Sequence, residues 1–209
     1  VLILQPDFGM LILFFFMWFI QILLSGISIK IILMVFLAGF FTSLVAFFKY
    51  EHVRFRIQSF FNSSLGDNYQ INKSLDALSS GGFFGKGLGS GDVSERLPDV
   101  HSDFIFSLAG EELGLLFLIF LISIYILIFT RVIILLVKEN NLFVFLSSSG
   151  LIVIFIIQCL INICSALNLI PTKGMTLPFL SYGGSSLISC SLIIGFILCL
   201  TKKKVKLNE

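Results

Sequence analysis

The sequence predicts an all-α membrane protein, a polytopic helical bundle with five transmembrane helices. Of its 209 residues, 57% are hydrophobic and only 12% are charged, and the mean hydropathy is +1.04. Because a soluble domain is about 45–50% apolar and about 25% charged, this chain has too little polar surface for a water-soluble particle. The apolar residues also arrive in long blocks, which is typical of membrane spans.

A helix needs about 20 mostly apolar residues to cross the core of a bilayer. Five stretches have this character, and the last of them begins beside the helix-breaking residues Pro178, Gly183 and Gly184. The predicted spans are residues 10–27, 29–48, 113–136, 142–167 and 182–200.

Basic residues in short loops predict the orientation of such a bundle, because cytoplasmic loops carry the excess of Lys and Arg. A lysine cluster after the last span predicts a cytoplasmic C-terminus. Counting back places residues 49–103 and 168–181 outside, as a large and a second extracytoplasmic loop of a single transmembrane domain over residues 1–209. These loops hold most of the polar residues, so we expect the functional site there. The lysine cluster after the last span, which predicts the cytoplasmic C-terminus, consists of Lys202, Lys203, Lys204 and Lys206.

Net charge and cysteine placement exclude several classes of function. A net charge of +2 indicates no nucleic-acid partner. The four cysteines all lie inside apolar blocks, without CxxC spacing or a nearby histidine. They are therefore expected to be small buried hydrophobic residues rather than metal ligands.

The glycine-rich run at residues 81–91 resembles a phosphate-binding loop but fails its sequence test. Gly87 follows Lys86, where a Walker loop has Ser or Thr. We expect a tight, irregular loop whose glycines adopt positive φ, with loose binding of phosphate by backbone N–H groups as the alternative.

Acidic residues gather where the large loop re-enters the membrane. Asp103 is the last charge before an apolar run, and Glu111 and Glu112 follow it. From the residues alone, Ser102 or Asp103 is more often a helix cap than a catalytic group. A third polar cluster, residues 168–186, contains two prolines and the cation Lys173. Non-helical backbone of this kind either lines a cavity or shapes helix packing.

Four segments together resemble the FtsW/RodA/SpoVE (SEDS) family. They are QPDFG at residues 5–9, LPDVHSDFIF at 97–106, GEELG at 110–114 and PFLSYGGSS at 178–186. Ser102 stands where the family usually has Thr, which keeps the hydroxyl group. The resemblance implies that the five spans are the last five of a ten-helix fold and that the N-terminal half is absent from this chain. The segment at residues 171–176 resembles the division branch of the family.

The resemblance implies a glycosyltransferase that polymerises lipid II, the lipid-linked precursor of peptidoglycan, into glycan strands during division. Such a reaction is inverting, with undecaprenyl pyrophosphate as the leaving group. Asp103 matches the family's essential carboxylate and is the expected general base. The other expected site residues are Lys173, Lys86 and Arg96 for the leaving group, and His101, Ser181 and Tyr182 for the substrate. Glu111 and Glu112 are expected to orient Asp103 or to pair with buried cations.

The remaining expectations concern partners, metals and rival functions. The resemblance implies a bacterial inner-membrane protein with an extracytoplasmic site, a class B penicillin-binding protein as transpeptidase partner, and other membrane proteins of the division machinery. No residue cluster predicts a resident metal, although a divalent cation bridging Asp103 and pyrophosphate is left open. The alternatives are a lipid II flippase, which would carry ionisable residues near the span centres, and a non-catalytic scaffold.

Overall fold

The computed structural model describes residues 8–50, 54, 69–94, 97–170 and 174–202. Throughout this part of the chain the regular elements are helices, which confirms the predicted all-α class. The six long helices are α1 (Phe8–Leu24), α2 (Ile29–Lys49), α4 (Tyr69–Ser80), α5 (Ile105–Val137), α6 (Leu142–Ala166) and α7 (Gly184–Thr201).

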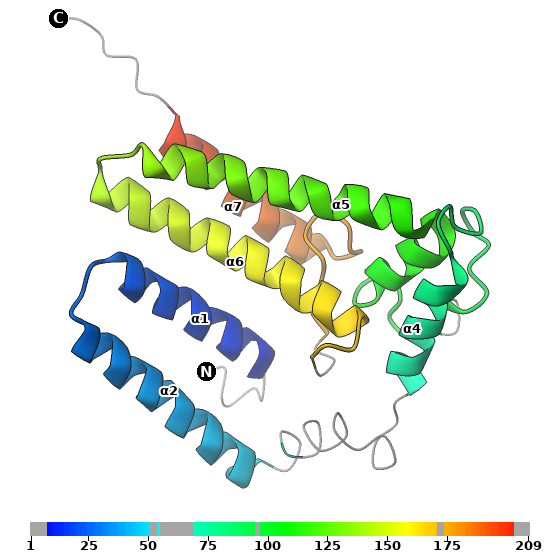
Figure 1. Ribbon diagram of the computed structural model, residues 1–209, viewed down its shortest axis with the longest axis horizontal. Helices are drawn as coiled ribbons and strands as arrows, with labels where there is room; N and C mark the ends of the chain where they lie inside the picture. The colour runs from blue at the N-terminus through cyan, green and yellow to red at the C-terminus, as the bar shows by residue number, and fades with distance from the viewer. Residues whose placement is uncertain (1–7, 51–53, 55–68, 95–96, 171–173, 203–209) are drawn as a thin grey trace, which may run out of the picture.

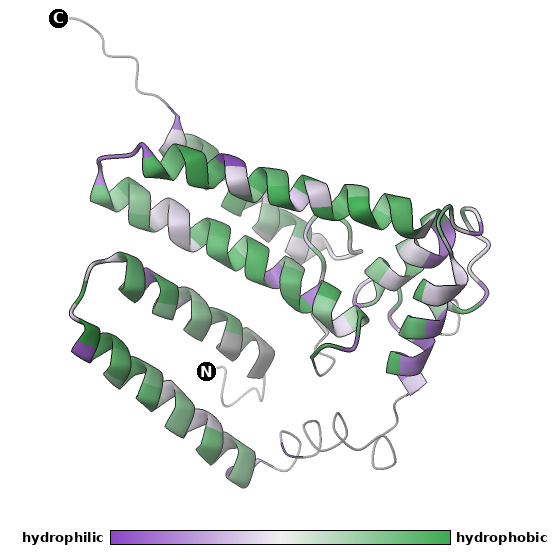
Figure 2. Cartoon of the chain, viewed as in Figure 1, coloured by the Kyte–Doolittle hydropathy of each residue, from purple (hydrophilic) through white to green (hydrophobic). Residues whose placement is uncertain are grey.

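Helices α2, α5, α6 and α7 are long and apolar enough to cross a membrane, and the chain is a multi-pass membrane protein. The helix α1 matches the first predicted span but has 17 residues, which is about 25 Å at the rise of an α-helix. Hydrophobic residues cover these five helices along their length, whereas polar residues gather at their ends and on α4 (Figure 2).

The helices α5, α6 and α7 lie side by side and form the core, α1 packs on α6, and α2 packs on α1 (Figure 1). Large buried side chains fill the centre of this group. Phe155 and Ile152 of α6 are fully buried, and Phe155 contacts the ring of Tyr125 from α5 edge to face, with centroids 6.1 Å apart. The Tyr125 hydroxyl donates a hydrogen bond to the Pro178 carbonyl at 2.7 Å, so the core also holds the loop before α7.

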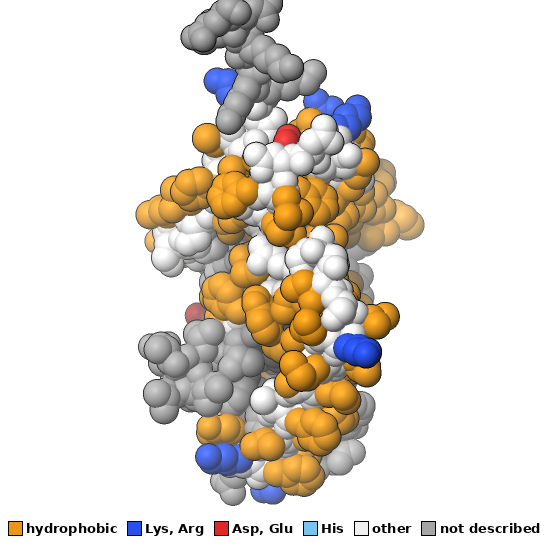
Figure 3. All heavy atoms as spheres, turned by 90° about the vertical axis from the view of Figure 1, so that its left-hand side faces the viewer, with side chains coloured by type: hydrophobic (Ala, Val, Ile, Leu, Met, Phe, Trp, Pro, Cys, Tyr) orange, Lys and Arg blue, Asp and Glu red, His pale blue; other side chains and the backbone are white. Residues whose placement is uncertain are grey.

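The two ends of the bundle differ. The turns at residues 25–28 and 138–141 lie at one end, together with the C-terminal end of α7 (Figure 1). Lys and Arg side chains are scattered among hydrophobic ones when the molecule is viewed from this end (Figure 3). Helix α4, the glycine-rich loop and the loops around residues 97–104 and 174–183 lie at the opposite end.

The sequence pattern missed a break inside α5. Gly114 has φ 80° and ψ 178°, so residues 105–113 form a separate short helix before the predicted span at 113–136. The glycine-rich loop satisfies backbone groups that the break leaves free: Lys86 and Gly87 N–H bond to the Glu111 and Glu112 carbonyls, and Leu115 N–H bonds to the Gly82 carbonyl, each at 2.9 Å.

Glycine is required where this loop meets the break. Gly85 has φ +78°, and a Cβ there would lie 2.2 Å from the Glu112 carbonyl oxygen. Gly82, Gly87 and Gly89 also have positive φ. The expectation of a tight loop with left-handed glycines is therefore confirmed, and its amide groups at Lys86 and Gly87 bind carbonyl oxygens of α5.

Candidate functional site

Asp103 lies in a tight turn immediately before α5. Its backbone N–H donates to the Asp99 carbonyl at 2.9 Å, and Asp99 adopts a left-handed conformation with φ 53°. Helix α5 begins after Phe104, which has no side-chain cap, and the Ser102 hydroxyl instead donates to the Asp99 carbonyl. Neither Ser102 nor Asp103 caps this helix, so the capping interpretation of the Asp103 carboxylate is wrong.

The loop before α7 is fastened to this turn by hydrogen bonds. The backbone N–H of Tyr182 donates to the His101 carbonyl at 2.8 Å. The Ser181 hydroxyl donates to the Ser102 carbonyl and accepts a hydrogen bond from the Leu177 N–H at 2.7 Å. The structure therefore brings together two segments that are about 80 residues apart in the sequence and that the family resemblance had already singled out.

The Asp103 carboxylate is partly buried against the backbone of Gly174. A Cβ added at Gly174 would lie 2.8 Å from Asp103 Oδ2. Burial raises the pKa of Asp103 above its ordinary value, and the nearby charge of Asp99 adds to this, whereas a hydrogen bond from Ser102 opposes it. The carboxylate is thus a stronger base than an exposed aspartate.

A cavity of about 590 Å³ opens beside this turn. Three of the predicted substrate-binding residues, His101, Ser181 and Tyr182, lie along it, and Asp103 is two residues from His101 but is not among the lining residues. His101 and Tyr182 are exposed, so the cavity is open to the surroundings of the protein. The other lining residues are Ile105, Leu180, Gly183, Gly184 and Leu187.

Two amide side chains of α6 hold these loops, and the sequence analysis did not identify them. Asn162 donates to the Asp103 carbonyl at 2.9 Å and to the Met175 carbonyl at 2.6 Å. Gln158, one turn earlier, donates to the Thr176 carbonyl at 3.0 Å and to its hydroxyl at 3.1 Å. The available signal was their spacing, because two amides four residues apart lie on one face of an otherwise apolar span.

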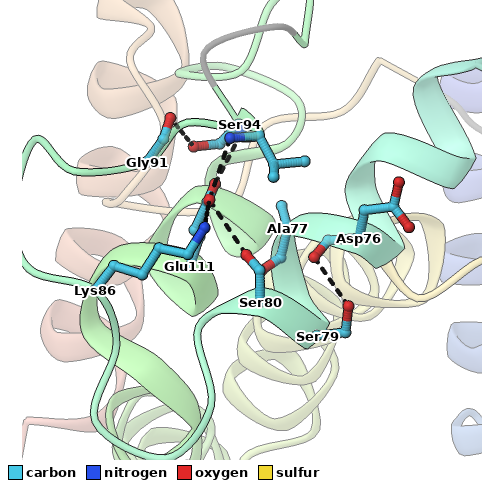
Figure 4. Close-up of polar contacts among 9 residues, drawn as sticks. Asp76, Ala77, Ser79, Ser80, Lys86, Gly91, Ser94 and Glu111 are labelled. Atoms are coloured by element: carbon cyan, nitrogen blue, oxygen red, sulfur yellow. Dashed lines mark hydrogen bonds and ion pairs between the residues drawn. The ribbon is translucent and has the colours of Figure 1, made fainter.

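Glu111 and Lys86 form a separate ion pair (Figure 4), in which Glu111 is fully buried and Lys86 is exposed. Glu111 Oε1 lies 2.6 Å from Lys86 Nζ and also accepts from the Ser80 hydroxyl, while Oε2 accepts from the Ser94 N–H at 2.7 Å. The cluster joins α4, the glycine-rich loop and the short helix before the break. Among the described residues, the partners of Glu111 do not include Asp103.

The other predicted site residues are less constrained. Glu112 accepts a hydrogen bond from the exposed N–H of Gly89 at 3.0 Å. Arg96 and Lys173 lie outside the described residues, although Lys173 adjoins Gly174. Within the described part of the chain, no three His, Cys, Asp or Glu residues come together as metal ligands.

The fold and this site define a polytopic helical membrane protein whose candidate site is assembled from loops at one end of the bundle. A family model for the FtsW/RodA/SpoVE proteins, described as "Cell cycle protein", matches residues 1–206. The chain therefore belongs to the FtsW/RodA/SpoVE family, as the four motifs predicted.

Curated relatives agree with this family. The chain is 39% identical over 206 residues to the "Probable peptidoglycan glycosyltransferase FtsW" of Caulobacter vibrioides, covering 97% of this chain and 52% of that protein. It is 40% identical over 207 residues to the protein of the same name from Buchnera aphidicola, covering 94% and 51%. The chain spans about half the length of the curated relatives that it matches.

Two solved structures share the fold. One belongs to a study titled "Structural coordination of polymerization and crosslinking by a peptidoglycan synthase complex", with a TM-score of 0.70, 26% identity and coverage of 94% of this chain and 56% of that one. The other is a mutant of the rod shape determining protein RodA from Thermus thermophilus, with a TM-score of 0.62, 28% identity and coverage of 96% and 51%.

Proposed function

We propose that the protein acts as a peptidoglycan glycosyltransferase that polymerises lipid II into glycan strands during division, with Asp103 as the general base. The observation that carries this proposal is the partly buried Asp103 carboxylate, held between two loops beside an open cavity. The names of the relatives support the same activity.

The proposed chemistry is one displacement at the anomeric carbon of a lipid-linked sugar. Asp103 takes the proton of the acceptor hydroxyl as its oxygen bonds to that carbon. The bond to the pyrophosphate breaks, and undecaprenyl pyrophosphate departs with the electron pair. A general base is most effective when its pKa lies nearer the working pH, and the raised pKa of Asp103 moves it in that direction.

The cavity beside Asp103 is suited to the polar part of such a substrate. His101 and Tyr182 offer a ring nitrogen and a hydroxyl at its exposed rim, while Ile105, Leu180 and Leu187 make the remainder apolar. A substrate that carries both a sugar pyrophosphate and a polyprenyl chain needs these two kinds of surface together.

The leaving pyrophosphate requires positive charge, and we assign this role to Lys173 and Arg96. Lys173 follows from its position next to Gly174, whose backbone lies against the Asp103 carboxylate. Lys86 was a further candidate, but its ammonium group lies 2.6 Å from the buried Glu111 carboxylate. We infer that Lys86 and Glu111 hold the glycine-rich loop on α5 rather than contact the substrate.

The proposed orientation places this site outside the cytoplasm of a bacterial inner membrane. The basic residues after α7 and the basic end of the bundle (Figure 3) support a cytoplasmic C-terminus. The loops that carry Asp103 and Tyr182 lie at the opposite end of the helices (Figure 1). Residues 49–103 and 168–181 are then the two extracytoplasmic loops.

We also propose that the protein works with a class B penicillin-binding protein, the transpeptidase that crosslinks the new strands, and with other division proteins of the membrane. The support is the similarity to a structure from a study of a peptidoglycan synthase complex, whose title couples polymerisation to crosslinking.

The experiment separates polymerisation from transport and from scaffolding. The full-length protein, purified with its penicillin-binding partner, is reconstituted in liposomes that contain fluorescent lipid II. A polymerase yields a ladder of glycan strands on a gel, with the partner alone as the control. Movement of lipid II across the bilayer without strands would favour a flippase, and the absence of both activities would favour a scaffold.

A further inference from the structure

Asn162 occupies a position that links the proposed base to the second loop. Its side chain is 1% exposed, in the middle of the polar contacts at one end of α6. Both hydrogens of its amide are donated, one to the Asp103 carbonyl at 2.9 Å and the other to the Met175 carbonyl at 2.6 Å. One side chain therefore holds two backbone segments that approach from different loops.

We propose that Asn162 is a positioning residue, which sets the place of the Asp103 carboxylate against Gly174 by clamping the carbonyls of Asp103 and Met175. This inference rests on the proposed function. On one side Asn162 holds the backbone of Asp103 itself, and on the other it holds Met175, the residue after Gly174. A Cβ at Gly174 would lie 2.8 Å from Asp103 Oδ2.

The contribution of Asn162 to stability does not by itself explain why an amide side chain stands at this position of α6. The Asn162 oxygen is buried and has no hydrogen-bond partner among the described residues. A buried polar atom without a partner costs about 1–3 kcal/mol, which offsets much of what the two donated hydrogen bonds contribute. A geometric role explains the residue better, because only a side chain with two donors joins both carbonyls.

Gln158 provides a matched comparison on the same helix. Its amide also donates two hydrogen bonds to the second loop, both to Thr176. Thr176 Oγ1 in turn lies 2.7 Å from the Ser186 hydroxyl of α7. Gln158 therefore holds this loop on the bundle, and its hydrogen bonds among the described residues do not include the Asp103 backbone. Variants of Gln158 and Asn162 can therefore test the docking of the loop and the positioning of the base separately.

The test compares Asn162→Leu and Gln158→Leu in the full-length protein with its transpeptidase partner. Strand formation is measured over a range of lipid II concentrations, at equal amounts of folded protein. Asn162→Leu is expected to lower kcat about 10- to 100-fold, because a misplacement of about 1 Å has an effect of that size. Its KM should stay within about twofold. Gln158→Leu should lower kcat less than about threefold, although both variants lose two hydrogen bonds from the side chain to the loops.

If Asn162→Leu does not fold, a second variant, Asn162→Ser, still tests the proposal. Asn162→Ser retains one donor in a smaller side chain and should give an intermediate kcat with unchanged KM. Wild-type kcat in whichever Asn162 variant folds, or an equal loss of kcat in Gln158→Leu, would overturn the proposal. Asp103→Asn is assayed in parallel: if it polymerises normally, the proposed function has failed, whereas an inactive Asp103→Asn beside fully active Asn162 variants refutes the positioning role alone.

Discussion

At the scale of single residues, the proposed chemistry depends on the environment of one carboxylate. Asp103 is held by its own turn, by the Gly174 backbone and by Asn162, and it is not engaged as a helix cap. Its hydroxyl-bearing neighbours Ser102 and Ser181 are occupied with backbone carbonyls. A hydrogen bond from Ser102 also reaches the carboxylate, but burial outweighs it, so the carboxylate stays more basic than an exposed aspartate.

The pH dependence of kcat tests this environment. The ionised form of Asp103 is the active base, and burial penalises that form, so its pKa lies above the ordinary value of about 3.9. We expect kcat to fall as the pH is lowered through this raised pKa, at higher pH than an exposed aspartate would titrate. A group with a raised pKa in the folded state favours folding as the pH falls, so this loss is not acid unfolding caused by Asp103. A flat kcat down to about pH 4 would contradict the assignment, with the folded fraction monitored at each pH.

Replacement of Gly174 by alanine tests the close approach to the base. The added methyl group would lie 2.8 Å from Asp103 Oδ2. Because this oxygen is at the end of the Asp103 side chain, the carboxylate moves away and the backbone stays in place. We therefore expect Gly174→Ala to fold normally while kcat falls several-fold, because the carboxylate is displaced. Gly195→Ala in α7 is the control, since a Cβ there meets nothing within 4 Å and Gly195 is not among the residues that line the cavity. Equal rates for the two variants would show that the carboxylate position is not constrained by this loop.

At the scale of elements, the buried Glu111 carboxylate and its partner Lys86 join three segments that surround the break in α5. Adjacent glutamates allow a controlled test. Glu111→Gln removes the charge that Lys86 and the Ser94 N–H face in a buried site, and we expect it to lower the free energy of unfolding by about 2–3 kcal/mol. Unfolding in mixed detergent micelles, followed by circular dichroism, provides the measurement.

Glu112→Gln is the matched control for that experiment. Glu112 contacts the exposed N–H of Gly89, so the change in unfolding free energy should stay within about 0.5 kcal/mol. If Glu112→Gln proved as destabilising as Glu111→Gln, the ion pair of Glu111 with Lys86 would not be what holds the glycine-rich loop on α5.

The spans and the motif residues were predictable from the sequence, whereas the arrangement between them was not. Long apolar blocks predict α2, α5, α6 and α7 because a bilayer demands their length and composition. The amphipathic helix α4 was missed, since its twelve residues carry a mixed polar pattern. The break at Gly114 also escaped notice, because its backbone groups are satisfied by a loop some thirty residues earlier.

The candidate site was predictable to a similar extent. The family motifs identified His101, Asp103, Ser181 and Tyr182, and the structure brings their two loops together. The partner of Lys86 was not predictable, because Glu111 is 25 residues away and the pair forms only when the loop folds back on α5. Asn162 was not predicted as a site residue, because it is an uncharged residue inside an apolar span and its contact with Asp103 joins residues 59 apart in the sequence.

At the scale of the whole molecule, the proposed orientation has a direct test. Ser90 is exposed in the glycine-rich loop, and Asn140 is exposed in the turn between α5 and α6 at the opposite end of the bundle. In spheroplasts, Ser90→Cys should react with a membrane-impermeant maleimide from outside, whereas Asn140→Cys should react only after lysis. The unsubstituted chain, which has four free cysteines of its own, is the control. The reverse pattern would place the Asp103 loop in the cytoplasm.

The proposed function requires that Asp103 performs the chemistry of strand formation. The most direct measurement compares wild type and Asp103→Asn as full-length proteins with the transpeptidase partner, at equal folded amounts, and records lipid II binding and glycan-strand formation in the same preparations. We expect Asp103→Asn to bind lipid II like the wild type and to form no strands, because asparagine preserves the shape but cannot accept the proton. Strand formation by Asp103→Asn at the wild-type rate would contradict the proposed function.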